Sequence, residues 1–214
     1  MPPYAVTSPI PARTGVARTG VTVVLPSAAP YRRPLPAGGA ILNGAGECTG
    51  FISAGEWGLL ESPIFLTSTM QLGRVYDAAC QLMLERDPGI AEDVVIPVVA
   101  ECDDSHLNDA RRMQVSHDDV ARAYAAAVAS AAAPAPPDLG AVGAGTGMSC
   151  FEFKGGIGTA SRVLSGGFTL GVLLLTNFGS RHRLTVAGVP VGERLPSHRQ
   201  SRLRRTRAPA SASC

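Results

Sequence analysis

Hydrophobic side chains in the first half of the chain occur as short β-branched runs separated by prolines and glycines. Three of these runs, residues 21–25, 63–67 and 94–100, predict β-strands. Residues 40–42 predict a fourth, very short strand that opens onto a glycine turn. The first 19 residues contain four prolines and show no period, and we interpret them as a loose arm.

Between these runs the spacing of apolar residues changes to that of an α-helix. One apolar stripe consists of Leu72, Val75, Tyr76, Ala79 and Met83. Such a stripe predicts one buried helix face, and Asp-Pro-Gly at residues 87–89 ends that helix. A second helix is predicted over residues 116–132, because Ser116 can cap the backbone while Asp118 and Asp119 favour the positive first turn.

A glycine-rich segment precedes the last hydrophobic runs of the chain. Six of the twenty residues from 143 to 162 are glycine, which permits positive φ angles and the close approach of another chain segment or a ligand. Residues 168–176 and 184–186 predict two further strands around the turn Asn177-Phe178-Gly179. The loose alternation of strands and helices indicates an α/β or α+β layered domain.

Composition adds one feature to this picture, a basic C-terminus. Hydrophobic residues make up 45% and charged residues 17% of the 214, with a net charge of +2, which is typical of a globular chain. Residues 197–214, however, contain five arginines and no acid. Such a tail could bind nucleic acid through phosphates. Because no aromatic residues are interleaved, a disordered or aberrant C-terminus is the favoured interpretation.

Cysteine usage and hydropathy bear on the cellular compartment. The five cysteines are scattered, odd in number and form no CxxC pair, which argues against a disulfide scaffold or structural zinc. We expect small buried thiols in a reducing compartment. Neither a secretory signal nor an apolar run of spanning length is visible. The expectation is a cytoplasmic protein without membrane or nucleic-acid partners.

Common catalytic motifs are missing, and two candidate sites stay open. A phosphate-binding loop requires Gly-Lys followed by Ser or Thr, but Lys154 is followed by Gly155, so this motif is absent. Neither GxGxxG nor GxSxG occurs. The acidic residues between 101 and 109 could hold a hard cation, but a solvated or hydrogen-bonded loop is more common, and no metal site is predicted. Asn177 could donate to a developing oxyanion or merely shape the turn, and the local residues alone favour the turn.

Seven segments, in order, resemble the L-aminopeptidase/D-esterase family (DmpA-type, β-peptidyl aminopeptidases). They are TGVTVVLP (19–26), LNGAGECTG (42–50), EWGLLESPIFLTST (56–69), PVVAECDDSHLND (97–109), GAGTGMSCFEFKGGIGTASR (143–162), VLLLTNFG (172–179) and LTVAGVPVGERL (184–195). The resemblance runs from about residue 16 to residue 195, and the stretch 143–162 is its most specific part.

The resemblance implies a self-cleaving serine aminopeptidase. Its members cut themselves ahead of a serine, which becomes the N-terminus of a smaller β chain and acts as nucleophile. The free α-amine can act as base, because its pKa of about 7.7–8.0 lies near neutrality. The resemblance further implies part of a four-layer αββα sandwich, a homo-oligomer, peptide, amide or ester substrates, and neither metal nor organic cofactor.

Two site residues follow from the resemblance alone. Asn177 matches the family's oxyanion-stabilising asparagine, which reverses the interpretation as a turn residue. Glu101 matches a glutamate that would hold the ammonium of the substrate or of the nucleophile. Trp57 and Glu61 lie in a matching segment without an assigned role, and Ser68 stands where the family usually has Asn.

Both ends of the chain depart from the family. Residues 1–15 form a divergent arm in place of the usual opening. After Leu195 the basic tail, residues 196–214, replaces the apolar strand that carries the nucleophile. We therefore expect residues 16–195 to be an α-subunit-like domain, truncated before the nucleophile and inactive alone. The alternative is a non-catalytic binding or assembly partner of an intact homologue. A frameshift would account for the tail.

Overall fold

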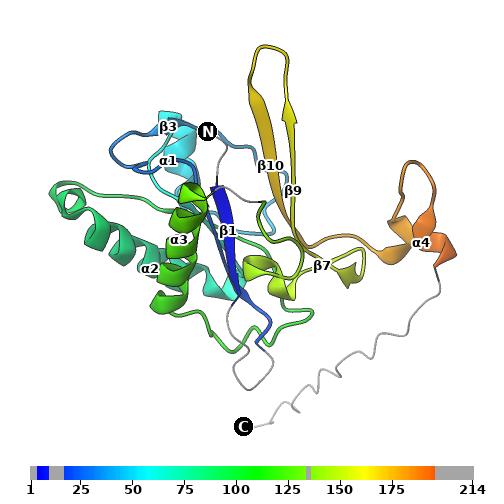
Figure 1. The fold of residues 1–214 in the computed structure, drawn as a ribbon. Helices are drawn as coiled ribbons and strands as arrows, with labels where there is room; N and C mark the ends of the chain where they lie inside the picture. Colours follow the sequence, from blue (N-terminus) through cyan, green and yellow to red (C-terminus); the bar gives the residue numbers. More distant parts are fainter. Residues whose placement is uncertain (1–3, 10–16, 134–135, 196–214) are drawn as a thin grey trace, which may run out of the picture.

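A four-stranded sheet forms the centre of the molecule. The computed structural model describes residues 4–9, 17–133 and 136–195 (Figure 1). The sheet has the order β1-β2-β5-β6. Its strands are β1 (Tyr4–Pro9), β2 (Gly20–Leu25), β5 (Ile64–Thr67) and β6 (Val98–Glu101). Only β5 and β6 run parallel, which brings their carboxyl ends to the same edge of the sheet.

Two helices cover one face of this sheet, α2 (Leu72–Arg86) and α3 (His117–Ala132). The alternation along β2 sends Val21, Val23 and Leu25 into the core that both helices line. Phe65 of β5 lies opposite Val23 in the register and is completely buried. In the apolar stripe predicted for α2, Val75, Ala79 and Met83 are buried, and Leu72 and Tyr76 pack against the core, which confirms the stripe as the core-facing side of the helix.

The opposite face of the sheet carries the glycine-rich segment. Thr22 alternates away from the helices, and its hydroxyl accepts a hydrogen bond of 3.1 Å from the amide of Ala144 in the 3₁₀ turn η3 (Gly143–Gly147). A Cβ on Gly20 would lie 2.3 Å from the carbonyl oxygen of Gly143. Another chain segment thus makes the close approach that the glycines predicted.

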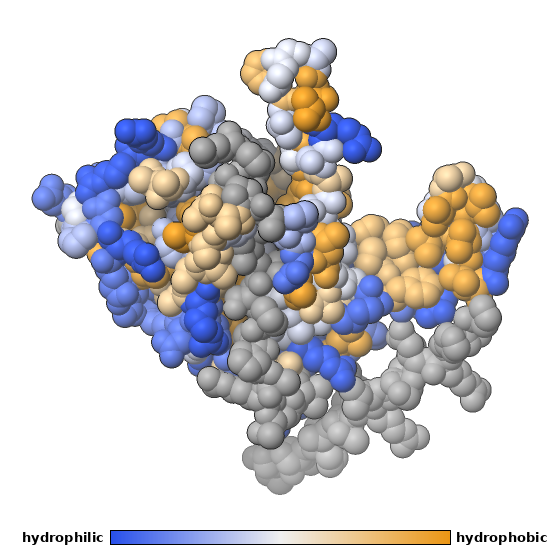
Figure 2. Space-filling model, in the orientation of Figure 1, coloured by the Kyte–Doolittle hydropathy of each residue, from blue (hydrophilic) through white to orange (hydrophobic). Residues whose placement is uncertain are grey.

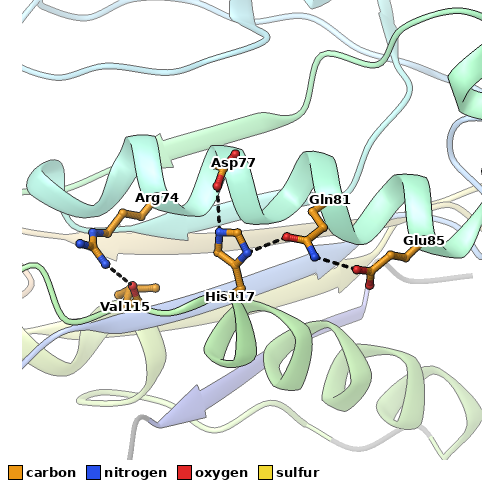
Figure 3. A network of polar contacts seen from close by, with 6 residues as sticks. All are labelled: Arg74, Asp77, Gln81, Glu85, Val115 and His117. Carbon is orange, nitrogen blue, oxygen red and sulfur yellow. Dashed lines mark hydrogen bonds and ion pairs between the residues drawn. The ribbon is translucent and has the colours of Figure 1, made fainter.

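Polar side chains join α2 and α3 along their outer surface (Figure 3). His117 lies between two α2 residues, with Nε2 at 2.8 Å from Asp77 Oδ2 and Nδ1 at 2.7 Å from Gln81 Oε1. The Gln81 amide in turn donates to Glu85 over 2.8 Å. Ser116, directly before His117, forms a capping box with Asp119 in the first turn, which confirms the predicted start of α3.

A long hairpin extends from this body (Figure 1). Its strands are β9 (Gly156–Val163) and β10 (Thr169–Thr176), paired antiparallel over eight residues each. A smaller hairpin, β7 (Ser149–Cys150) and β8 (Phe153–Lys154), lies at its base, and α4 (Val191–Arg194) follows it. Figure 2 shows hydrophobic residues gathered on the long hairpin and around α4.

The remaining short elements connect these parts. They are β3 (Leu35–Pro36), α1 (Phe51–Trp57), β4 (Leu59–Leu60) and the 3₁₀ turns η1 (Thr69–Gln71), η2 (Pro88–Glu92) and η4 (Arg181–Arg183). Within the described residues, no helix has the length and hydropathy that a membrane span requires.

Four structural expectations need correction. Residues 40–42 form no strand, since Ile41 and Leu42 are 72% and 96% exposed and lack a sheet neighbour. Residues 184–186 contribute only an isolated bridge between Val186 and Val189. The strand predicted over 94–100 begins only at Val98, where pairing with β5 starts. The loose arm contains β1, because its backbone pairs with β2; residues 10–16 and the basic tail lie outside the described residues.

The cysteines also differ from expectation. Cys48, Cys80, Cys102 and Cys150 are free thiols, as their spacing predicted, but they are partly rather than fully buried. Cys214 lies outside the described residues.

Candidate active site

The candidate site forms where β5 and β6 end. Because these strands are parallel, Ser68 and Thr69 after β5 lie beside Glu101 and Asp103 at the end of β6. The amide of Cys102 still donates to the carbonyl of Thr67 over 3.1 Å, which keeps the two strand ends together. The sheet thus brings two segments that are about 30 residues apart in the sequence to the same edge.

Glu101 is held at both carboxylate oxygens. Its Oε1 accepts a hydrogen bond of 2.9 Å from the amide of Glu47, and its Oε2 accepts one from the hydroxyl of Thr69. A Cβ on Gly46 would lie 2.8 Å from the same Oε1, so the loop before Glu47 passes close to the carboxylate. These contacts fix the orientation of a negative group that can hold a cation.

Asn177 lies at the end of β10 and is turned toward the same edge. Its Nδ2 donates to the carbonyl oxygen of Asp103, two residues after Glu101. Its Oδ1 lies 3.4 Å from the hydroxyl of Ser149, which donates to it. The structure therefore brings both predicted site residues to one sheet edge, with the backbone of Asp103 as the link between them.

Buried polar groups support this edge from below. The side chains of Thr19, Ser68, Asp104 and Asn108 are all buried. The hydroxyl of Thr19 donates to Ser68 over 3.1 Å, and the amide of Asn108 donates to Asp104 over 3.1 Å. Burial raises the pKa of the Asp104 carboxyl above its ordinary value. Ser68 is thus part of a cluster of hydrogen-bonded polar groups.

The electrostatics of the edge are dominated by carboxylates. Burial, together with the charges of Glu101, Asp103 and Asp104, raises the pKa of the Cys102 thiol to about 11. Cys102 is therefore a neutral thiol at pH 7 and a poor nucleophile. Such a field favours a positively charged group at Glu101.

The acidic residues do not form a metal site in the part of the chain that the structure describes. There, no group of three or more His, Cys, Asp or Glu side chains is arranged to hold a metal ion. The carboxylate of Asp103 accepts from Ser105, and that of Asp109 contacts Arg111. The hydrogen-bonded loop favoured for residues 101–109 matches these contacts.

Several residues of the site carried no sequence signal of their own. Glu47, Thr69 and Ser149 sit in segments that resemble the family, but only the fold shows which groups they contact. Glu61 has a local structural contact, since its Oε1 accepts from the amide of Ile96 over 3.3 Å. Trp57 ends α1 and is more than half exposed.

Comparison with known proteins gives one family. The model of peptidase family S58 matches residues 6–213. Two β-peptidyl aminopeptidases named BapA are similar over 185 residues, at 43% identity in Sphingosinicella microcystinivorans and 39% in Sphingosinicella xenopeptidilytica. In both cases the match covers 85% of this chain but 45% of the relative. The chain thus spans about half the length of these relatives.

Solved structures agree with this assignment. A β-aminopeptidase from Burkholderia sp. superposes with a TM-score of 0.80 at 44% identity, covering 91% of this chain and 55% of that one. The L-aminopeptidase D-Ala-esterase/amidase of Ochrobactrum anthropi, described as a variant of the Ntn-hydrolase fold, gives 0.77 at 36% identity, covering 91% and 55%. The chain therefore has an α+β fold of this Ntn-hydrolase type and belongs to peptidase family S58.

Proposed function

We propose that this chain forms the α-subunit-like part of a serine aminopeptidase that releases N-terminal residues from peptides, amides or esters. The observation that carries the proposal is that the Asn177 side chain donates to the backbone carbonyl of Asp103, two residues after Glu101 at the end of β6. A fixed carboxylate and a fixed amide donor are what binding a free amino terminus and stabilising an oxyanion require. The names of the relatives point to the same reaction.

In the proposed reaction, Glu101 binds the ammonium of the substrate and thereby places the following carbonyl near Asn177. A serine hydroxyl attacks that carbonyl, and the serine's own α-amine takes the proton. Asn177 donates its second N–H to the resulting oxyanion. Collapse of the tetrahedral intermediate expels the amine of the next residue, which takes the proton held by the serine's α-ammonium. Water then attacks the acyl-enzyme, gives a proton to the α-amine, and releases the N-terminal residue and the serine hydroxyl. The serine would come from a segment matching the remaining part of the relatives, so the 214 residues alone are without turnover.

The test is reconstitution with aminoacyl and β-aminoacyl p-nitroanilides. The chain alone should release no nitroaniline, and co-production with the part of the Burkholderia β-aminopeptidase that this chain does not match should produce turnover. In that complex Asn177→Ala should lower kcat about 100-fold or more, because it removes an oxyanion donor. Glu101→Gln should mainly raise KM, since it removes the charge that binds the ammonium.

A matched control keeps this test specific. Glu85→Gln makes the same change on the outer surface of α2, away from the site, and should leave both constants unchanged. Sustained turnover by the purified 214-residue chain would contradict its proposed inactivity. Full activity of Asn177→Ala in the complex would refute the assignment of the oxyanion donor.

The exposed hairpin favours a second candidate, a non-catalytic assembly partner of an intact homologue. Phe168, Leu170, Val172 and Leu174 are all exposed on β10 or the turn before it, which is the kind of apolar surface that binds another chain. Co-purification of this chain with an intact family member, lost on Leu174→Lys, would support this role. Reconstituted turnover without such an association would favour the enzyme.

A further inference from the structure

The hairpin β7–β8 contains the most unusual backbone conformation beside the candidate site. Phe151 and Glu152 form its two-residue turn and have φ angles of 51° and 61°. Positive φ at both central positions defines the turn type that strongly prefers Asn-Gly, so two bulky residues are strained there. Strain of this kind persists where surrounding contacts enforce it, commonly beside functional sites.

Specific contacts align this hairpin with the end of β10. Cys150 pairs in parallel with Phe178, and the amide of Phe151 donates to the carbonyl of Phe178 over 2.7 Å. The rings of Phe151 and Phe178 pack edge to face with centroids 4.9 Å apart. A Cβ on Gly179 would lie 2.6 Å from the Phe151 ring, so only glycine allows this packing. The residue before each bridge partner is then Ser149 on one side and Asn177 on the other.

This alignment gives Ser149 a specific task. The carbonyl of Asp103 can only accept, so it determines that Nδ2 of Asn177 points toward it. The hydroxyl of Ser149 contacts the other end of the carboxamide, Oδ1, at 3.4 Å. That contact is longer than an ordinary hydroxyl hydrogen bond, as catalytic hydrogen bonds often are before substrate binds. Held at both ends, the amide plane leaves one N–H of Asn177 for a ligand.

We propose that Ser149 is a positioning residue, delivered by the strained β7–β8 turn, which fixes the carboxamide of Asn177 for oxyanion binding. This inference rests on the proposed function of Asn177. Without the Ser149 hydroxyl the carboxamide pivots on the Asp103 carbonyl, and its free N–H spends less time directed at the oxyanion. Loss of the Ser149 hydroxyl should therefore weaken stabilisation of the transition state rather than substrate binding.

The first experiment measures the anchoring itself on the 214-residue chain. Side-chain ¹⁵N relaxation of Asn177 should show an ordered carboxamide in the wild type and in Ser149→Thr, and a mobile one in Ser149→Ala. Ser161→Ala, on the exposed part of β9, is the matched control and should change nothing. An equally ordered carboxamide in Ser149→Ala would overturn the inference, whatever the enzyme assays show.

The second experiment uses the reconstituted complex. Loss of one neutral hydrogen bond should lower kcat about fivefold in Ser149→Ala with KM unchanged, and Ser149→Thr should restore kcat. Unchanged kcat in Ser149→Ala, beside a large loss in Asn177→Ala, refutes the positioning role alone. Unchanged kcat in Asn177→Ala refutes the proposed function instead, and the relaxation experiment still decides whether Ser149 anchors the side chain.

Discussion

Strands β2 and β10 have similar hydrophobic sequences and opposite surroundings. In β2, Val23 is completely buried between the helices and its strand neighbours. In β10, Val172 is 45% exposed, and among the described residues β10 pairs only with β9. A run of apolar residues therefore predicts that a segment becomes a strand, but a second layer decides whether its side chains leave water.

The difference has an energetic consequence for the two regions. Buried apolar surface contributes about 25 cal/mol per Å², so most of the stabilisation comes from the sheet beneath α2 and α3. A two-stranded hairpin by itself is marginally stable in water. We expect the long hairpin to contribute little to folding until another surface covers it, and the serine-bearing segment of the proposed function would be such a surface.

The largest expected effect is the difference in stability loss between substitutions at two phenylalanines. Phe65→Ala should lower the free energy of unfolding by about 3–5 kcal/mol, because it leaves a cavity in the completely buried core. Phe168→Ala removes the same atoms from a ring that is 74% exposed and should change stability by less than about 0.5 kcal/mol. Urea unfolding followed by circular dichroism measures both. Equal losses would show that the hairpin is packed as tightly as the sheet.

A smaller version of the comparison uses matched valines. Val23→Ala should cost about 2 kcal/mol, since a buried branched side chain loses its contacts. Val172→Ala should cost less than about 0.5 kcal/mol in the chain alone. In the reconstituted complex its cost should rise toward that of Val23→Ala. A cost that does not change on reconstitution would argue that the added segment leaves this strand uncovered.

The smallest effect concerns the buried side of the site. The pKa of Asp104 is raised by burial, so the folded chain takes up its proton at a higher pH than the unfolded chain. Relative to Asp104→Asn, the wild type should gain stability as the pH falls from 7 through this raised pKa, levelling near the ordinary value of 3.8. Unfolding of both proteins across this pH range tests the sign. A pH-independent difference would contradict the burial of a charged carboxyl.

Glu101 and Asn177 are predicted as site residues by the resemblance to the family rather than by local chemistry. The local residues predict a turn for Asn177, because Asn-Phe-Gly after a strand is a turn signal that does not depend on which groups the asparagine side chain contacts. The contacts of Asn177 with Asp103 and Ser149 join segments 74 and 28 residues apart. No local pattern encodes such distances. Similarly, the hydropathy of residues 184–186 predicts a strand, but hydropathy does not show whether a neighbouring strand is present to pair with them.

By itself, the sequence determined the helices α2 and α3, the strands β2, β5 and β10, and the need for close backbone packing around residues 143–162. These features depend on side-chain period, capping and glycine, which act over a few residues. Only the tertiary structure decided which apolar strands are buried and which groups orient Glu101 and Asn177. The reason is physical: burial and hydrogen-bond geometry depend on the segments that meet in space. The parallel pairing of β5 with β6 brings Thr69 to Glu101, whereas contacts with Asp103 and Ser149 orient Asn177.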